Sequence, residues 1–203
     1  ADIATEVILG KSLKEQGIFA LYPEEKKRWY CKVPVFSFTK IHGVDAYLSP
    51  EMKSTGEAIG YDDDLYRAFY KALQASGMTV QNYGTVLVTI ADKDKDEALP
   101  LIRRFYNLGF NIEATVGTAK FLKEHGIRTR VKNKISDGSD DIPKAIRDGY
   151  LAYVINTSDM SSNDQQMDGH EIRRLAVETN TTMFTSLDTV RVLLDVLEDI
   201  TIT

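Results

Sequence analysis

The stretch from residue 85 to residue 122, "TVLVTIADKDKDEALPLIRRFYNLGFNIEATVGTAKFL", contains two apolar runs, each followed by a segment with helical periodicity. The runs at 85–91 and 110–114 are rich in β-branched and aromatic residues, which favour strands. Between them, Asp94 is a candidate N-cap and Gly109 a candidate stop for a helix. The expected buried face of that helix consists of Ala98, Leu101, Ile102 and Phe105. Strand followed by helix, twice in succession, is typical of an α/β fold.

The same alternation continues to the end of the chain. Further apolar runs, each preceding a helical segment, are "RTRV" at 128–131, "LAYVIN" at 151–156 and "TTMFT" at 181–185. Five strand-and-helix units in one stretch predict an open, mostly parallel sheet. We therefore predict an α/β fold with a five-stranded, mostly parallel, Rossmann-like sheet flanked by helices on both faces.

Residues 1–80 do not show this regular alternation of strands and helices. The expected elements are a helix over 2–16, a strand over 29–38, a loop over 49–60 and a helix over 62–76. Gly17 is the expected stop of the first helix, and Pro34 indicates an edge or a break in the strand. These elements make a poor independent core, so we interpret them as an α+β piece of something larger. A linker is expected around residues 76–84.

Composition narrows the classes of function. The chain has 203 residues, of which 43% are hydrophobic, so it can bury a substantial core. A net charge of −5 and a pI near 5.3 argue against nucleic-acid binding. Cys31 is the single cysteine, and no Cys/His spacing indicates a metal site. With neither a signal peptide nor a run of roughly 20 apolar residues for a membrane span, we expect a cytoplasmic protein.

Polar residues gather in the turns that follow the predicted strands. These turns are "ADKDK" at 91–95, "TVGT" at 115–118, "KNKISDG" at 132–138 and "NTSD" at 156–159. In a parallel sheet with right-handed crossovers they open on one edge, where ligands usually bind. Their lysines, hydroxyls and amide, rather than a concentration of acids, suit an anion at a helix start. Gly117 lets the backbone approach such an anion closely.

Each of these residues also has a plain structural interpretation. Thr115 and Thr118 are ordinary helix caps when taken alone, Lys95 and Lys134 are ordinary surface charges, and Asn156 is an ordinary turn residue. The four turns on one predicted edge are what favour a binding site. No catalytic residue is assigned, because there is no G-x-S-x-G elbow, and the acids of "SDGSDD" at 136–141 are explained by a turn and a helix start.

Several stretches resemble a known family. They are "GKSLKEQG" at 10–17, "PVFSFTKIHGVDAYLSPEMKSTGEAIG" at 34–60, "EATVGTAKFL" at 113–122, "RVKNKISDG" at 130–138 and "YVINT" at 153–157. Together they resemble the carboxyl-terminal end of the large chain of carbamoyl phosphate synthase, the glutamine-dependent ligase of pyrimidine and arginine synthesis. The resemblance extends over essentially the whole chain. It implies that residues 1–80 end the second ATP-grasp unit, that residues 81–203 form a regulatory domain similar in fold to methylglyoxal synthase, and that the chain is a fragment.

The resemblance also implies ligands. In that family the regulatory domain binds UMP as an inhibitor and IMP or phosphoribosyl pyrophosphate as activators. The positions that match the family's effector contacts are Lys95, Thr115, Thr118 and Lys134 for phosphate, then Asn156 and Ser158, the last usually a threonine. Members that respond to ornithine use an acid and a tyrosine where this chain has Val33 and Met183, which favours a pyrimidine-pathway enzyme.

The family's ATP, Mg²⁺ (or Mn²⁺) and carbamate ligands lie mostly upstream of this chain. We therefore expect no cofactor and no synthase activity in this polypeptide alone. The implied partners are the remainder of the large chain and the small glutaminase subunit, and a homo-oligomer is left open.

Two other classes of function compete with regulation. A methylglyoxal-synthase-type lyase would use the same phosphate pocket, but its G-P-x-G-G-D motif is replaced here by "ISDGSDDIP" at 135–143. A resemblance to inosinate cyclohydrolase is weaker again. The second competing class, after the lyase, is a purely structural interaction domain.

Overall fold

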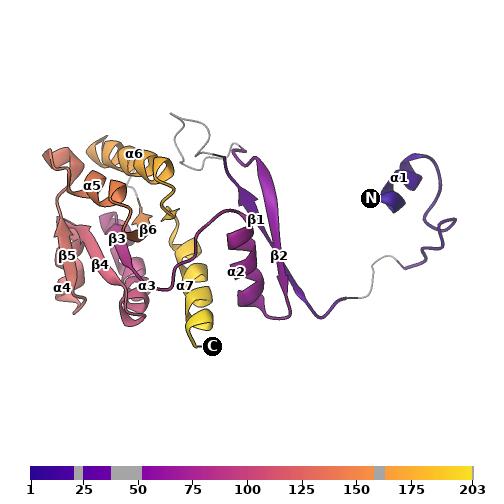
Figure 1. Ribbon diagram of the computed structural model, residues 1–203, viewed down its shortest axis with the longest axis horizontal. Helices are drawn as coiled ribbons and strands as arrows, with labels where there is room; N and C mark the ends of the chain where they lie inside the picture. Colours follow the sequence, from indigo (N-terminus) through magenta and orange to yellow (C-terminus); the bar gives the residue numbers. More distant parts are fainter. Residues whose placement is uncertain (21–24, 38–51, 158–162, 203) are drawn as a thin grey trace.

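A five-stranded sheet forms the centre of the larger part of the molecule (Figure 1). The computed structural model describes residues 1–20, 25–37, 52–157 and 163–202. The strands are β3 (Thr85–Thr89), β4 (Asn111–Thr115), β5 (Thr129–Lys132), β6 (Leu151–Asn156) and β7 (Met183–Phe184). Their order is β5-β4-β3-β6-β7, and every neighbouring pair is parallel. The predicted fold class is confirmed, with the sheet wholly parallel.

Helices cover both faces of this sheet, as predicted. On one face lie α3 (Lys95–Asn107), α4 (Val116–Glu124) and α7 (Leu187–Ile202), and on the other α5 (Asp141–Arg147) and α6 (Asn163–Glu178). The alternation of side chains along β3 explains the division, because Val86 and Val88 join the first core while Leu87 joins the second. Each face of the sheet therefore has an apolar core of its own.

The helix α3 agrees with the sequence-based prediction in its buried face and in its end. Its four buried residues are Ala98, Leu101, Ile102 and Phe105, the predicted face. Gly109 follows the helix with a φ of 92°, which only glycine adopts readily. The predicted cap is wrong in one respect, since Asp94 occupies the N-cap position without a side-chain cap bond. The chain enters α3 from a 3₁₀ turn, η2 (Asp92–Asp94), whose last N–H bonds to the carbonyl of Ala91.

The first predicted helix is shorter than expected. The helix α1 (Asp2–Ile8) stops well before Gly17, and no residue in it is buried. Gly10, with a φ of 96°, follows it, and Ser12 and Glu15 then bond to each other's side chains and backbone in a separate turn. A short helix without a packing partner is marginal in water, so local turn chemistry prevails over helical periodicity here.

A two-stranded antiparallel sheet and one helix make up the rest of the N-terminal part: β1 (Trp29–Val35), β2 (Gly56–Asp62) and α2 (Leu65–Ala75). The expected loop over 49–60 is wrong at residues 56–60, which belong to β2, whereas residues 52–55 lie outside any helix or strand. Pro34 pairs with Glu57 in a sheet whose strands are both edges, as its missing N–H requires. Asp64 caps α2 by accepting the N–H of Arg67 at 2.9 Å.

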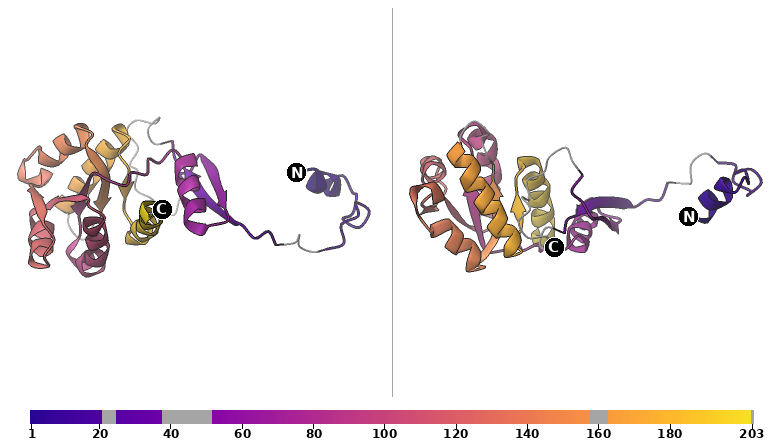
Figure 2. Two further views of the ribbon diagram at one scale, coloured as in Figure 1. Left: turned by 60° about the horizontal axis from the view of Figure 1, so that its bottom comes forward. Right: turned by 90° about the horizontal axis from the view of Figure 1, so that it is seen from above.

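Residues 76–84 connect this N-terminal unit to the sheet, and Figures 1 and 2 show α2 beside α7. Leu73 and Met78 pack against the larger core. The hydroxyl of Tyr153, in the middle of β6, donates to the carbonyl of Gln81 and accepts its N–H, both at 2.7 Å. The two parts are thus joined both by apolar contact and by a buried tyrosine.

Candidate functional site

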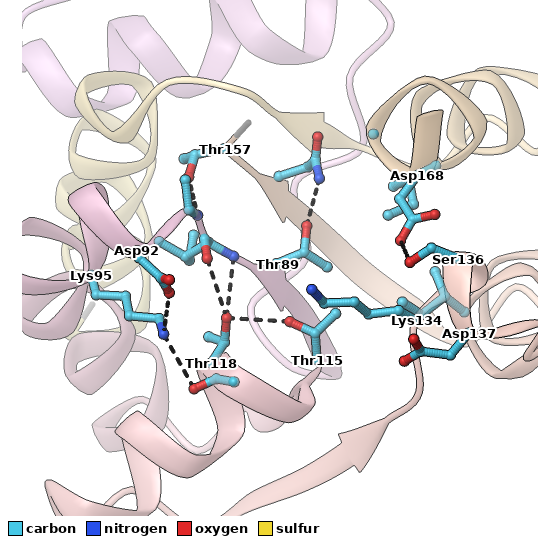
Figure 3. A pocket seen from close by; sticks show the side chains of 17 residues that line it. Thr89, Asp92, Lys95, Thr115, Thr118, Lys134, Ser136, Asp137, Thr157 and Asp168 are labelled. Atoms are coloured by element: carbon cyan, nitrogen blue, oxygen red, sulfur yellow. Dashed lines mark hydrogen bonds and ion pairs between the residues drawn. The ribbon is translucent and has the colours of Figure 1, made fainter. Parts of the chain in front are cut away.

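A cavity of about 370 Å³ opens where the carboxyl ends of β3, β4 and β6 meet (Figure 3). Its wall is built from turns and helix starts. The lining residues are Thr89, Ile90, Ala91, Asp92, Lys95, Thr115, Gly117, Thr118, Lys134, Ser136, Asp137, Ile142, Asn156, Thr157, Asp168, Gly169 and Ile172. The carboxyl edge of a parallel sheet is the usual ligand site of such folds. The cavity is large enough for a small ligand of a few hundred Å³.

Lys95, the first residue of α3, forms one end of the cavity. Its side chain is only 18% exposed, and its ammonium lies 2.6 Å from the carboxylate of Asp92. The same ammonium donates to the carbonyl of Gly117 at 3.4 Å and lies 5.8 Å from the ring centre of Phe121. Lys95 therefore brings a positive charge to the first turn of α4.

That first turn presents hydroxyls and backbone N–H groups. Thr115 is at the N-cap position of α4 but makes no side-chain cap bond, so the first N–H groups lack that partner. Instead its hydroxyl donates to the hydroxyl of Thr118 at 3.3 Å. Thr118 in turn bonds to the N–H and carbonyl of Ile90, both at 3.4 Å. Bonds of this length are weak, so the two hydroxyls can turn toward an anion at little cost.

Lys134 enters from the opposite wall. It precedes the 3₁₀ turn η3 (Ile135–Asp137), which ends at Gly138 in the left-handed conformation. Figure 3 shows its ammonium reaching between Thr89 and Thr115. Beyond it, the hydroxyl of Ser136 donates to the carboxylate of Asp168 at 3.0 Å, which joins η3 to α6. A second positive charge therefore faces the same space as Lys95.

The floor of the cavity comes from the ends of β3 and β6. The side chain of Asn156 is 5% exposed, and its amide NH₂ donates to the hydroxyl of Thr89. Its amide oxygen is buried and has no hydrogen-bond partner in the part of the chain that the structure describes. Next to it, the hydroxyl of Thr157 accepts the N–H of Ala91 at 2.9 Å. A buried acceptor without a donor is costly, which makes Asn156 a candidate contact for a ligand or an ordered water.

The structure thus brings together the predicted site residues that it describes: Lys95, Thr115, Gly117, Thr118, Lys134 and Asn156. Ser158 lies outside the described residues. The expectation of few acids is wrong, because Asp92, Asp137 and Asp168 also line the cavity. Asp92 and Asp137 were within the quoted turns, whereas Asp168 belongs to α6 and lies outside those turns.

The chemistry available in the cavity is binding through charge and hydrogen bonds, with carboxylates at its rim. Within the described ranges no group of histidine, cysteine and acidic side chains is arranged to hold a metal ion. Nor is any described helix both long and apolar enough to cross a membrane. The two lysines, the hydroxyls and the open start of α4 suit a phosphate group.

Comparison with known proteins shows what part of this chain is similar to. A solved structure of methylglyoxal synthase from Elizabethkingia anophelis NUHP1 is 22% identical, with a TM-score of 0.47, over 57% of this chain and 79% of that one. Residues 97–185 match the family model of the MGS-like domain. The matched segment runs from α3 to just after β7 and includes the turns at Thr115, Lys134 and Asn156. This part of the chain is therefore similar to the MGS-like domain.

Proposed function

We propose that this chain is the allosteric regulatory portion of a glutamine-dependent carbamoyl phosphate synthase large chain. In this proposal the cavity binds a phosphate-bearing effector: UMP as an inhibitor, IMP or phosphoribosyl pyrophosphate as an activator. The observation that carries it is the convergence of Lys95, Lys134 and the uncapped start of α4 on one cavity. The resemblance of the sequence to the regulatory end of that large chain supplies the identity of the effectors.

The phosphate is best accommodated between the two lysines. Backbone N–H groups at the start of α4 and the hydroxyls of Thr115 and Thr118 can bond its oxygens, and Gly117 leaves room for a close approach. The rest of the effector then extends toward Asn156, whose buried amide oxygen needs a donor. Sugar hydroxyls and base N–H groups are such donors.

Regulation further requires that the effector favour one arrangement of the protein over another, typically by about 1 to 3 kcal/mol. We propose residues 1–80 as the end of the second ATP-grasp unit and residues 81–203 as the regulatory domain. The strand β6 carries Asn156 at its end and Tyr153, which binds the linker at Gln81, in its middle. This continuity supports a route from the cavity to the N-terminal unit.

Catalysis belongs to the parent enzyme in this proposal. ATP and Mg²⁺ (or Mn²⁺) would bind to the upstream remainder of the large chain, and ammonia would come from the small glutaminase subunit. The chain alone should therefore produce no carbamoyl phosphate. A coupled assay showing ATP-dependent turnover by this polypeptide would contradict that expectation.

The effector proposal is tested by thermal shift and calorimetry with UMP, IMP and phosphoribosyl pyrophosphate, with uridine as the control. Saturable stabilisation by a phosphorylated ligand, absent with uridine, is expected because only the folded state binds it. Lys95→Ala and Lys134→Ala should each weaken UMP binding roughly tenfold or more, as expected for the loss of a charge-assisted bond. Lys93→Ala, on the exposed side of η2, is the matched control. Equal affinities for all variants would contradict the site, and no binding by any phosphate ester would favour a purely structural domain.

A lyase is the second candidate, and the carboxylates of the cavity are the observation that favours it. Methylglyoxal formation from dihydroxyacetone phosphate begins with removal of a proton, which a carboxylate can accept. Asp137 and Asp168 both line the cavity. The sequence between 135 and 143 lacks the G-P-x-G-G-D motif of that enzyme, so we expect no methylglyoxal when the chain is incubated with dihydroxyacetone phosphate. Formation of methylglyoxal that is lost in Lys95→Ala would reverse the order of the two candidates.

A further inference from the structure

Lys134 extends from a short segment that is fixed on both sides by acidic residues. On one side, the carboxylate of Glu113, in β4, lies 3.4 Å from the ammonium of Lys132. On the other, one carboxylate oxygen of Asp141 accepts the backbone N–H of Asn133 at 3.0 Å and its side-chain amide at 2.8 Å. Lys134 is the next residue, and its ammonium is the group that enters the cavity (Figure 3). The segment is therefore fixed immediately before the lysine that we expect to bind phosphate.

We propose that Asp141 is a positioning residue for Lys134: by holding Asn133 it fixes the direction in which Lys134 reaches toward a bound phosphate group. This inference rests on the proposed function of the cavity. It assigns a role in effector binding to a residue outside the cavity. Asp141 is not among the lining residues of the cavity. In this proposal its influence on binding passes through Asn133, which it holds by two hydrogen bonds.

Asp141 is suited to this role by its own surroundings. It is the first residue of α5, and the next residue, Ile142, is buried in the second core together with Ile146. Its N–H also bonds to the hydroxyl of Ser139 at 3.2 Å. The bond from the N–H of Asn133 lowers the pKa of the Asp141 carboxyl, so the acceptor stays ionised at neutral pH. A charged acceptor at the start of α5 therefore suits the task of holding Asn133 and orienting the neighbouring Lys134.

The experiment compares UMP affinity by calorimetry in the wild-type chain, Asp141→Ala, Asp141→Asn and Asp140→Ala. Asp141→Ala should weaken UMP binding about tenfold, because Lys134 is no longer held. Asp141→Asn keeps one acceptor oxygen and should recover most of the affinity. Asp140→Ala removes the same charge from the same helix start, but its carboxylate pairs with Arg147 at 3.3 Å and not with Asn133, so its affinity should equal that of the wild type.

A double-mutant cycle separates positioning from a general loss of charge. In the Lys134→Ala background, Asp141→Ala should cause no further loss of affinity, since the lysine it positions is absent. Additive losses would overturn the proposal, as would an unchanged affinity of Asp141→Ala in a wild-type background.

Hydrogen exchange tests the same inference without a ligand. The amide of Asn133 should exchange faster in Asp141→Ala than in the wild type or Asp140→Ala, because its acceptor has been removed. An unchanged exchange rate would overturn the proposal whether or not UMP binds. If the exchange rate rises but neither UMP nor inorganic phosphate binds to the wild-type chain, the proposed function has failed, and with it the part of this inference that concerns phosphate.

Discussion

The two parts of the molecule are stabilised in different ways. The five-stranded sheet buries large side chains on both faces, among them Phe105, Leu122 and Leu194. The fully buried cluster of the N-terminal unit, by contrast, consists of the small side chains of Cys31, Ala68 and Ala72, and the larger ones packed against it, Val33, Leu65 and Phe69, are only partly buried. Apolar side-chain volume therefore stabilises the first part, whereas the second depends on close approach between backbones.

The outer face of the small sheet sharpens this contrast. Its exposed side chains include Tyr30 at 54%, Ile59 at 60% and Tyr61 at 52%. Two strands with one helix are marginal as an independent unit. We conclude that the N-terminal unit is the less stable of the two, and that its contacts with α7 and with β6 contribute much of its order.

The largest effect is expected at Gly60, where β2 meets α2. A Cβ at this position would lie 2.2 Å from the carbonyl oxygen of Ala68 and 2.3 Å from the nitrogen of Ala72. These are backbone atoms that cannot move aside, so Gly60→Ala should destabilise the N-terminal unit by about 3 kcal/mol or more. Urea titration followed by the fluorescence of Trp29, the single tryptophan, reports on this unit.

Gly56→Ala is the matched control, because among the described residues a Cβ would meet only the Cβ of Val35 within 4 Å, at 3.8 Å, an ordinary contact. The far-ultraviolet signal of the five-stranded sheet should persist in Gly60→Ala. If both parts unfold together at the wild-type urea concentration, the idea that they are stabilised separately is wrong.

The sequence predicts the five-stranded sheet better than it predicts the N-terminal unit. Regular alternation of β-branched runs and amphipathic helices predicts the parallel sheet, because the central strands β3 and β6 are buried on both faces and the helices on one. In the N-terminal unit, Gly56 and Gly60 belong to a stretch that resembles a loop in composition. Only the approach of α2 explains why the strand needs glycine at position 60, and α2 follows later in the chain.

For the candidate site, too, the sequence predicts only some of the residues. Collecting the turns after the strands identifies Lys95, Thr115 and Lys134, because topology alone brings those turns to one edge. It does not find Asp168, which reaches the cavity from the interior of α6, or Asp141, which acts through Asn133. Such residues depend on the packing angle of helices and on side-chain bonds, which have no signature in a single sequence.

A smaller effect is expected at Tyr153, which joins the two parts. Tyr153→Phe removes both hydrogen bonds to Gln81 but keeps the packed ring, so a loss of about 1 kcal/mol is expected. Tyr83→Phe, in the same linker and 76% exposed, is the control and should cost nothing measurable. An equal effect of the two substitutions in urea titrations would show that the Tyr153 hydroxyl does not join the parts.

The same tyrosine gives a dependence on pH. Burial raises the pKa of Tyr153 to about 12, from 10.0 for a free side chain. Since the folded state holds the proton more tightly, this contribution to stability is complete below pH 10 and is lost as the pH rises toward 12. The difference in free energy of unfolding between the wild type and Tyr153→Phe should therefore shrink over that range, which urea titrations at several alkaline pH values can measure. A difference that stays constant would mean that the hydroxyl is not buried.

The smallest effects are expected from the ion pairs, which should contribute more in the larger part than in the N-terminal unit. Arg104, on α3, donates to Glu198 at 2.7 and 2.8 Å and to Asp195 at 2.6 Å, both on α7, with its own side chain 27% exposed. Lys32 and Glu57, across the small sheet, are 2.8 Å apart but both 60% exposed. A forked, partly buried arginine contributes more than a solvated lysine, so Arg104→Gln should cost about 1 kcal/mol and Lys32→Gln less than about 0.5. Urea titrations at low and at 1 M salt test this, since only the exposed pair should lose most of its effect to screening. If Arg104→Gln and Lys32→Gln instead cost the same as each other and respond alike to salt, the partly buried fork adds nothing beyond a solvated pair, and charge does not distinguish the two parts of the molecule.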